Sequence, residues 1–333
     1  MLPVWALLNY PISGIETENK IMQLFKLNRA IDFMGMRKLA VALSATIILV
    51  AIASIVMRGM DLGIDFTGGT LIEVGYQQSA DLGVVRNALA DAGFQDATAQ
   101  HFGTTREVLV NLAPRVDMSN AELSDQAFNA LKQAVTGEAE LRRVEFVGPQ
   151  VGDELTEDGG LAMLYALVGI LIYVAMRFEY RFAVGSIVAL VHDVVITMGI
   201  FSLFQIEFDL PVLAAVLAVI GYSLNDTIVV YDRIRENFRK MRKGTPAEII
   251  NVSLNQTLAR TMMTSVTTLL VLCALFVLGG EIIHGFALAL IIGVVVGTYS
   301  SIYVASTAVL MLGISKADMM PVKKEGADVD AHP

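Results

Sequence analysis

Hydrophobic positions along this chain gather in six long runs separated by shorter polar segments. Each run is close to the length that a helix needs to cross the hydrocarbon core of a bilayer, about 20 residues. The runs are Leu39–Met57, Gly159–Met176, Phe182–Phe204, Leu210–Val230, Thr261–Gly280 and Gly285–Leu312. The pattern predicts a polytopic α-helical membrane protein with six transmembrane helices, the first at residues 39–57 and the other five within residues 159–312.

Residues 58–158, between the first and second runs, follow a different pattern. Four stretches have the character of strands and two have a helical period. In chain order they are Thr70–Tyr76 (strand), Ser79–Gly93 (helix), Ala97–Phe102 (strand), Glu107–Leu112 (strand), 119–135 (helix) and Arg142–Val147 (strand). Ser119 and Glu122 form a capping-box pattern, and Gly103-Thr104-Thr105 is expected to be the turn between the middle strands. The order β-α-β-β-α-β predicts a ferredoxin-like α+β domain.

The two ends of the chain lie outside these units. Lys20–Lys38 mixes apolar and charged residues in a way that predicts an interfacial helix leading into the first span, within an N-terminal segment of residues 1–38. Residues 313–333 form an acidic tail without an apolar period, and we expect this tail to be disordered.

Composition and charge indicate on which side of the membrane each polar segment lies. The chain is 55% hydrophobic and 17% charged, which excludes most soluble enzymes. Lys and Arg concentrate on the cytoplasmic side of membrane proteins, and here they gather at three places: Arg37 and Lys38, Arg177 and Arg181, and Arg233 to Lys243. Both termini are therefore expected in the cytoplasm. Residues 58–158, with seventeen acidic and seven basic residues, are expected to form an acidic domain on the opposite side.

Ionisable groups inside the spans are the candidate functional residues, because each costs at least about 2.5 kcal/mol to insert. They are Asp193, which follows His192, Asp226, which follows Asn225, and Arg260 at the edge of the fifth span. A carboxylate in a helical bundle can carry a proton or sodium ion, and a facing arginine would keep it ionised until the ion arrives. A structural role stays open for Asp193, which His192 could hold, and Arg260 could instead reach the headgroups.

Other chemistry has no support in the sequence. There is no phosphate-binding G-x-x-x-x-G-K-[ST] motif, no metal-ligand spacing and no nucleophile–base pair, so no cofactor, metal or nucleic acid is expected, and no enzymatic activity.

Small residues mark two places of close packing. Gly285, Ala289, Gly293, Gly297, Ser301 and Ala305 recur at every fourth position of the sixth span and predict a helix-packing face that leaves a surface for a partner. Gly68-Gly69 precedes the first strand, where we expect a tight turn or close backbone approach that Asp65 caps.

Four motifs resemble the SecF branch of the SecD/SecF family of bacterial protein export, and they occur along the chain in the order that the family has. The most specific runs from Gly221 to Asn237, GYSLNDTIVVYDRIREN, and the others are Gly63–Thr70, Val144–Pro149 and Asn255–Thr261. The resemblance covers roughly residues 37–312 and does not extend to residues 1–36.

This resemblance implies a membrane half similar to RND transporters, which pairs with SecD and uses the proton or sodium gradient to move polypeptide on the outer side of the SecYEG channel. It implies YajC as a further partner and the bacterial inner membrane as the location, with residues 58–158 in the periplasm. Asp226 and Arg260 would be the functional pair. Asn225 and Asp193 are further ion-coupling candidates because they lie inside the spans, not because of the resemblance. Asp65, Phe66, Thr67, Gly68 and Gly69 would form a periplasmic hinge.

Two other functions remain as alternatives. One is half of an RND-like exporter of small molecules or lipids, although residues 58–158 make only one small domain, without room for large substrate-binding modules. The other is an intramembrane aspartyl protease with Asp193 and Asp226 as its dyad, although neither aspartate lies in a Gly-x-Gly-Asp context.

Overall fold

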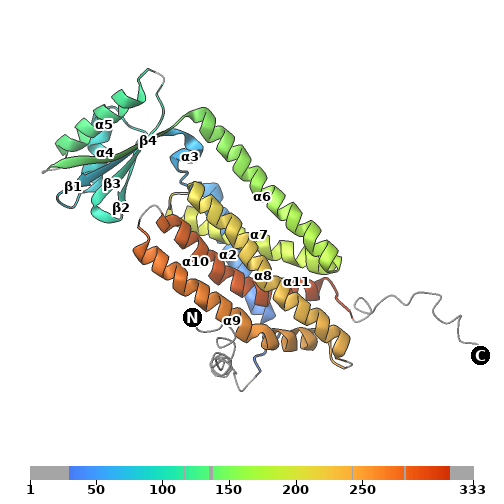
Figure 1. The fold of residues 1–333 in the computed structure, drawn as a ribbon. Helices are drawn as coiled ribbons and strands as arrows, with labels where there is room; N and C mark the ends of the chain where they lie inside the picture. The colour runs from blue at the N-terminus through green and yellow to red at the C-terminus, as the bar shows by residue number, and fades with distance from the viewer. Residues whose placement is uncertain (1–29, 116, 135–137, 242, 281–282, 316–333) are drawn as a thin grey trace, which may run out of the picture.

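The computed structural model describes residues 30–315, apart from residues 116, 135–137, 242 and 281–282. Six of its helices are long and apolar enough to cross a membrane, as predicted. They are α2 (Arg37–Arg58), α6 (Pro149–Arg177), α7 (Tyr180–Phe204), α8 (Leu210–Lys240), α9 (Pro246–Leu278) and a last span that joins α10 (His284–Ser300), the π-helical turn η3 (Ser301–Ala305) and α11 (Ser306–Met311). Figure 1 shows them as a bundle with a small α+β domain at one end.

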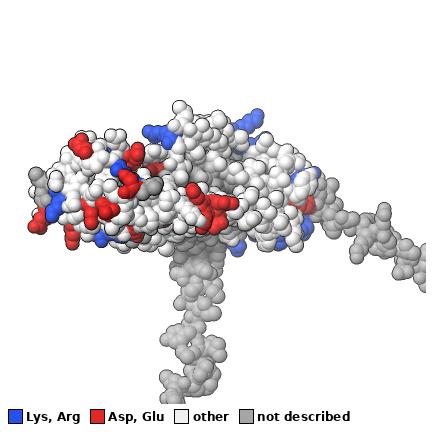
Figure 2. All heavy atoms as spheres, turned by 90° about the horizontal axis from the view of Figure 1, so that it is seen from above, with Lys and Arg blue, Asp and Glu red and all other residues white. Residues whose placement is uncertain are grey.

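The small domain has the predicted ferredoxin-like topology. After the short helix α3 (Ile64–Thr67), the chain forms β1 (Gly69–Tyr76), α4 (Leu82–Asp91), β2 (Thr98–Phe102), β3 (Thr104–Leu112), α5 (Asn120–Ala134) and β4 (Ala139–Val147). The antiparallel sheet has the order β2-β3-β1-β4, and α4 and α5 pack on one of its faces. We call residues 69–147 the ferredoxin-like domain. Charged side chains crowd its surface, whereas the same view of the bundle shows few (Figure 2).

The core of the ferredoxin-like domain follows from the two periodicities of its sequence. Ile72 and Val74 alternate on the inner face of β1, and Leu89 of α4 and Leu131 of α5 cover them, all four less than 2% exposed. The capping box at the start of α5 is present as predicted, since the N–H of Ser119 donates to Glu122 Oε2 over 3.0 Å and the N–H of Glu122 donates to Ser119 Oγ over 3.3 Å.

The predicted turn at Gly103-Thr104-Thr105 is wrong in its extent. β3 already begins at Thr104, which pairs with Phe102, so Gly103 alone carries the reversal. Gly103 has φ 72°, a conformation that residues with a Cβ rarely adopt. Polar strand residues look like turn residues in the sequence, and this explains the error.

Three transmembrane helices are longer than their apolar runs. α6 begins at Pro149 rather than Gly159, so residues 149–158 belong to this helix and not to the α+β domain; α8 continues to Lys240, and α9 begins at Pro246. Local signals set these ends rather than hydropathy. Pro149 occupies the first turn of α6, and Thr245 and Glu248 form a capping box at the start of α9.

The described residues just before α2 do not form the interfacial helix that the sequence predicts. Its described part, residues 30–36, contains turns and docks against α9: Asn255 Oδ1 accepts from the N–H of Ile31 over 2.9 Å, and Asn251 Oδ1 accepts from the N–H of Met34 over 3.2 Å. Phe33 and Met34 are buried in the bundle core, so their apolar side chains serve packing rather than lipid contact. The rest of that predicted helix and the predicted disordered tail, residues 316–333, lie outside the described residues.

The stripe of small residues on the last span packs against α8 of the same chain. A Cβ added to Gly293 would lie 2.1 Å from Val219 Cγ2, and one added to Gly297 would lie 3.1 Å from Ser223 Cβ. Ala289, Ser301 and Ala305 are also buried, and Gly285 meets Val212. The stripe therefore does not form the open surface for a partner that the sequence analysis expects.

We predict that residues 67–153 fold alone and unfold cooperatively. In this fragment Leu89→Ala should lower the free energy of unfolding by about 2–5 kcal/mol, because it opens a cavity in a closed core. Val84→Ala on the same helix, where the side chain is 44% exposed, should change it by less than about 0.5 kcal/mol. Denaturant titration followed by circular dichroism measures both, and equal effects would contradict the assignment of the core.

We also predict that Gly293→Ala lowers the thermal midpoint of the full chain in detergent, because the new methyl group would force α10 from α8 at a cost of about 1–3 kcal/mol. Gly169→Ala on α6 is the control, since nothing lies within 4 Å of its added Cβ. Alanine favours a helix over glycine by about 1 kcal/mol at either position, so the control should be neutral or stabilising. The same midpoint for both variants would refute the close α8–α10 contact.

Candidate functional site

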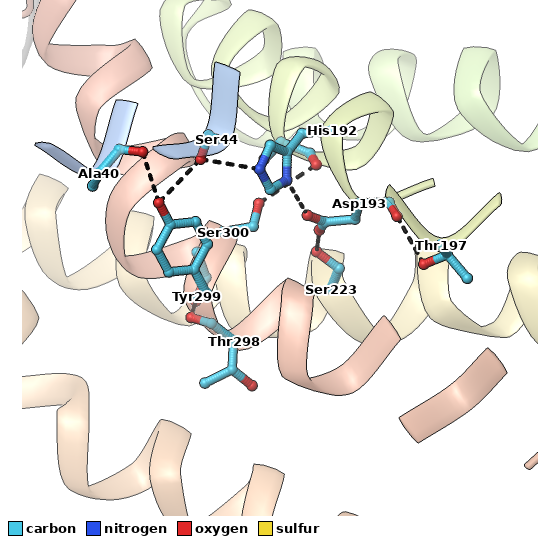
Figure 3. Close-up of polar contacts among 11 residues, drawn as sticks. Ala40, Ser44, His192, Asp193, Thr197, Ser223, Thr298, Tyr299 and Ser300 are labelled. Atoms are coloured by element: carbon cyan, nitrogen blue, oxygen red, sulfur yellow. Dashed lines mark hydrogen bonds and ion pairs between the residues drawn. The ribbon is translucent and has the colours of Figure 1, made fainter. Parts of the chain in front are cut away.

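Asp193 lies on α7 in the centre of the bundle and has hydrogen-bond partners for both carboxylate oxygens. His192 Nδ1 is 2.8 Å from Asp193 Oδ1, and Ser223 on α8 donates its hydroxyl to Asp193 Oδ2 over 2.5 Å. Both Asp193 and His192 are at most 3% exposed. Figure 3 shows this carboxylate held between two helices.

The hydrogen bonds continue from His192 across the bundle. His192 Nε2 lies 3.2 Å from Ser44 Oγ on α2, Ser44 Oγ lies 3.0 Å from Tyr299 Oη on α10, and Tyr299 donates to the carbonyl of Ala40 over 2.8 Å (Figure 3). One chain of polar contacts thus joins α2, α7, α8 and α10. Buried polar groups in a membrane bundle are stable when they are paired in this way. The geometry favours the structural role that the sequence analysis left open for Asp193.

Asp226 lies on α8, one turn beyond Ser223, in a different environment. It is 3% exposed and interacts with the hydroxyl of Thr264 on α9, but its Oδ2 has no hydrogen-bond partner among the residues that the structure describes. The neighbouring Asn225 is exposed, and so is Arg260, which lies one turn before Thr264. This face of α8 and α9 therefore carries polar groups that the chain itself does not cover.

Arg260 lines a groove of about 650 Å³ between α8 and α9. Four charged groups in this groove pair with each other, Arg177 with Asp232 over 3.4 Å and Arg233 with Glu236 over 2.8 Å. Arg260 makes no ion pair within the described part of the chain, so the expected contact with Asp226 is not formed in this state. Thr264 lines the same groove as Arg260 and also contacts Asp226. Both predicted partners therefore lie next to Thr264.

The remaining predicted sites can now be placed. Asp193 and Asp226 have separate partners, which gives no support to a shared-proton protease dyad. In the described part of the chain no group of three or more His, Cys, Asp or Glu residues lies close enough to hold a metal ion.

The Asp65–Gly69 segment joins the ferredoxin-like domain to the bundle. Gly68 has φ 65°, and an added Cβ would lie 2.7 Å from Pro149 Cα, while one on Gly69 would lie 2.6 Å from the carbonyl oxygen of Leu112. The close backbone approach that the sequence predicts is therefore present. Thr67 donates its hydroxyl to the carbonyl of Gly63 within this segment.

The predicted role of Asp65 as a cap for this turn is wrong. Asp65 Oδ2 accepts from the N–H of Leu210 over 3.0 Å, so it caps the first turn of α8. Phe66 packs on Phe208 with ring centroids 5.8 Å apart, just before the same helix. The segment thus holds the start of α8, and this contact between distant segments has no local sequence signal.

Sequence reasoning also missed the hydroxyl partners of the Asp193 network, namely Ser44, Ser223 and Tyr299. Each lies within an apolar run where a single hydroxyl is unremarkable, because a serine hydroxyl can bond to its own helix backbone and a tyrosine can pack as an aromatic side chain. Their roles depend on which sides of the helices pack together, and the periodicity of a single span does not contain that information.

A bundle of six spans with a ferredoxin-like domain between the first and second is the arrangement of the SecD/SecF class of membrane proteins. The family model "Protein export membrane protein SecD/SecF, C-terminal" matches residues 127–315, and "SecD/SecF GG Motif" matches residues 53–80, which include Gly68-Gly69. Protein translocase subunit SecF of Vibrio alginolyticus is 55% identical over 94% of this chain and 100% of its own length. SecF of Pseudomonas aeruginosa is 51% identical over 91% of this chain and 98% of its own. The chain belongs to the SecF family of protein translocase subunits.

Solved structures give the same result. The crystal structure of SecDF from Thermus thermophilus, described as a translocon-associated membrane protein, has a TM-score of 0.79 and 40% identity over 86% of this chain. A SecDF structure in a super-membrane-facing form has a TM-score of 0.64 at the same identity. This chain spans 39% of each of those longer chains. The names of these relatives favour protein export over a small-molecule exporter or a protease.

We predict that Ser223→Ala lowers the thermal midpoint of the bundle, because it leaves Asp193 Oδ2 buried without its donor at a cost of about 1–3 kcal/mol. Thr46→Ala on α2 is the control, since that exposed hydroxyl bonds only to a carbonyl of its own helix. Thermal unfolding in detergent measures both variants. If Ser223→Ala has no more effect than the control, the Asp193 network does not stabilise the bundle.

Proposed function

We propose that this chain is one half of a gradient-driven unit that pairs with a SecD-type protein and promotes late steps of polypeptide movement through the SecYEG channel. The observation that carries the proposal is the uncovered polar face of α8 and α9. Asn225 and Arg260 are exposed there, and buried Asp226 has an oxygen without a partner among the described residues.

Lipid is a poor cover for that face. Asp226 lies about 10 Å along α8 from Arg233, where the basic end of the helix begins, and this is farther than a short carboxylate side chain reaches. Asp226 itself is buried, but exposing the charged side chain of Arg260 to hydrocarbon costs about 2.5–3.5 kcal/mol. A second membrane protein with complementary polar groups would remove this cost, and the SecDF relatives are longer chains of which this chain spans 39%. This supports SecD as the partner.

Asp226 has the chemistry of a coupling residue. A carboxylate oxygen without a donor can bind a proton or sodium ion, and the groove beside Arg260 offers a polar route toward Thr264, which contacts Asp226. Each elementary charge that crosses the membrane gains about 2.3 kcal/mol per 100 mV. When the ion neutralises Asp226, a buried charge between α8 and α9 is removed, and the packing of these two helices can change.

α8 connects this site with the ferredoxin-like domain. Leu210, its first residue, lies about 24 Å from Asp226 along the helix axis, and Asp65 of the hinge holds its N–H. A shift of α8 would therefore move the hinge and the sheet that follows it.

The excess of Lys and Arg at Arg37, Arg177 and Arg233–Lys243 supports an orientation with both termini in the cytoplasm and residues 58–158 in the periplasm of a bacterial inner membrane. Translocating polypeptide and YajC remain further partners of the proposed assembly.

We predict that Asp226→Asn abolishes gradient-dependent export while assembly with SecD persists, because the amide keeps size and hydrogen bonding but does not titrate. Asp193→Asn is the matched control and should retain most export, since an amide can still bond Ser223 and His192. Export of a secreted reporter into energised inverted vesicles, with and without an uncoupler, measures both at equal complex abundance. Wild-type stimulation by the gradient in Asp226→Asn would refute the coupling role.

Arg260 refines this test. An electrostatic partner of Asp226 should tolerate lysine in part and alanine not at all, whereas a residue that only reaches the headgroups should tolerate both.

A further inference from the structure

The ferredoxin-like domain meets the bundle where the linker between α2 and α3 runs beside the loop between α7 and α8. The N–H of Phe208 donates to the carbonyl of Asp61 over 2.7 Å, and the N–H of Gly63 donates to the carbonyl of Phe208 over 3.0 Å. Leu62 and Phe208 thus form a short parallel bridge. We call this place the junction. It fixes the loop that carries Glu207 next to the base of the sheet.

One side-chain hydrogen bond crosses the junction to the sheet. Gln100 on β2 donates its Nε2 to Glu207 Oε2 over 2.6 Å. In the part of the chain that the structure describes, no other side-chain hydrogen bond joins the four strands to the membrane helices or their loops. The rest of the contact is apolar, with Ile64 of α3 against Leu71 and Leu109 on the open face of the sheet.

Glu207 is surrounded by acidic groups. Asp61 of the linker, Asp65 of α3 and Asp209 at the N-cap of α8 all repel its negative charge. Asp65 and Asp209 accept hydrogen bonds from the first turn of α8, over 3.0 Å from Leu210 and 2.8 Å from Val212. Burial raises the pKa of Asp209 and of Asp61 above the value of an exposed aspartate.

The other charged groups on the adjoining elements do not neutralise Glu207. Arg58 at the end of α2 donates to the carbonyl of Leu203, Arg143 on β4 pairs with Glu73 and Glu145, and His284 at the start of α10 stacks on Phe276. The first turns of α6 add only acidic groups, namely Asp153, Glu154, Glu157 and Asp158.

We propose that Glu207 is a proton-binding site, separate from Asp226, that works as a latch: the protonated form keeps the ferredoxin-like domain docked on the bundle, and the ionised form releases it. The neutral carboxyl still accepts from Gln100, so docking keeps this hydrogen bond. When the proton leaves, four half-buried carboxylates lie together, and this favours an open junction that hydrates them more fully.

The pH range follows from the local environment. Burial, and then the charges of Asp209 and Asp61, raise the pKa of Glu207 to about 7 in the docked state, from 4.5 for an exposed glutamate. A group that binds its proton more tightly in the docked state stabilises that state at low pH, and the stabilisation is lost as pH rises through the docked-state pKa. Between pH 6 and pH 8.5 the ratio of docked to open molecules should fall about tenfold.

The test measures the distance across the junction in the full chain in lipid nanodiscs, without a gradient or a partner, so its result is independent of the export proposal. Cys273, the single cysteine, is replaced by serine, and spin labels are attached through Asp91→Cys on α4 and Leu278→Cys at the exposed end of α9. Pulsed electron paramagnetic resonance should show one short distance at pH 6 and a growing longer one at pH 8.5. A distance distribution that does not change with pH would overturn the proposal.

Variants assign the effect to Glu207. Glu207→Gln should stay docked at both pH values. Asp61→Asn should raise the docked fraction at pH 8.5 and weaken the pH response, because one repelling charge is gone and the docked-state pKa of Glu207 is raised less. Glu138→Gln is the matched control, since Glu138 Oε2 also accepts from a glutamine, Gln77, over 3.1 Å, but at an exposed site. It should keep the wild-type pH response. A pH response that survives in Glu207→Gln, or disappears equally in Glu138→Gln, would refute the latch.

Discussion

Polar groups within membrane-spanning helices must be satisfied by protein, because the hydrocarbon offers them no partners, and the arrangement of this bundle depends on that constraint. Asp193 meets it inside the chain, where His192 and Ser223 occupy both carboxylate oxygens. Asp226 meets it only in part, since one oxygen has no partner among the described residues, and Asn225 and Arg260 beside it face outward. The two aspartates therefore differ in kind: Asp193 is fully paired and structural, whereas Asp226 has an oxygen that an ion can bind.

α8 links these two situations with the rest of the molecule. Its inner face receives the small-residue stripe of α10 and holds Ser223 against Asp193, whereas its uncovered face presents Asn225 next to buried Asp226. Its first turn is capped by Asp65 from the segment that joins the ferredoxin-like domain to the bundle. If Asp226 carries the coupled ion, as we propose, a change in its charge would act on the helix that also anchors the domain, and this would give a physical route from the membrane site to a movement outside the membrane.

Local sequence patterns predicted the helices and strands. Features that depend on contacts between distant segments could not be predicted in this way. The six spans, the β-α-β-β-α-β order and the capping box at Ser119 depend on periodicity over a few turns, so the sequence contains them. The extra turns of α6, α8 and α9 are polar and escaped a hydropathy criterion. The cap that Asp65 provides to α8 depends on tertiary placement, as does the burial of the Gly293 stripe within the chain, and the Asp226–Arg260 contact stays a prediction for the assembled state.

The central claim is that the face of α8 and α9 around Asn225 is covered by a second membrane protein. Site-specific photo-crosslinking from position 225 in native membranes tests this most directly, because the reactive group replaces an exposed side chain. Our account predicts one dominant product with a SecD-type membrane protein, identified by mass spectrometry. Crosslinks to lipid alone, at normal abundance of the chain and of SecD, would contradict it.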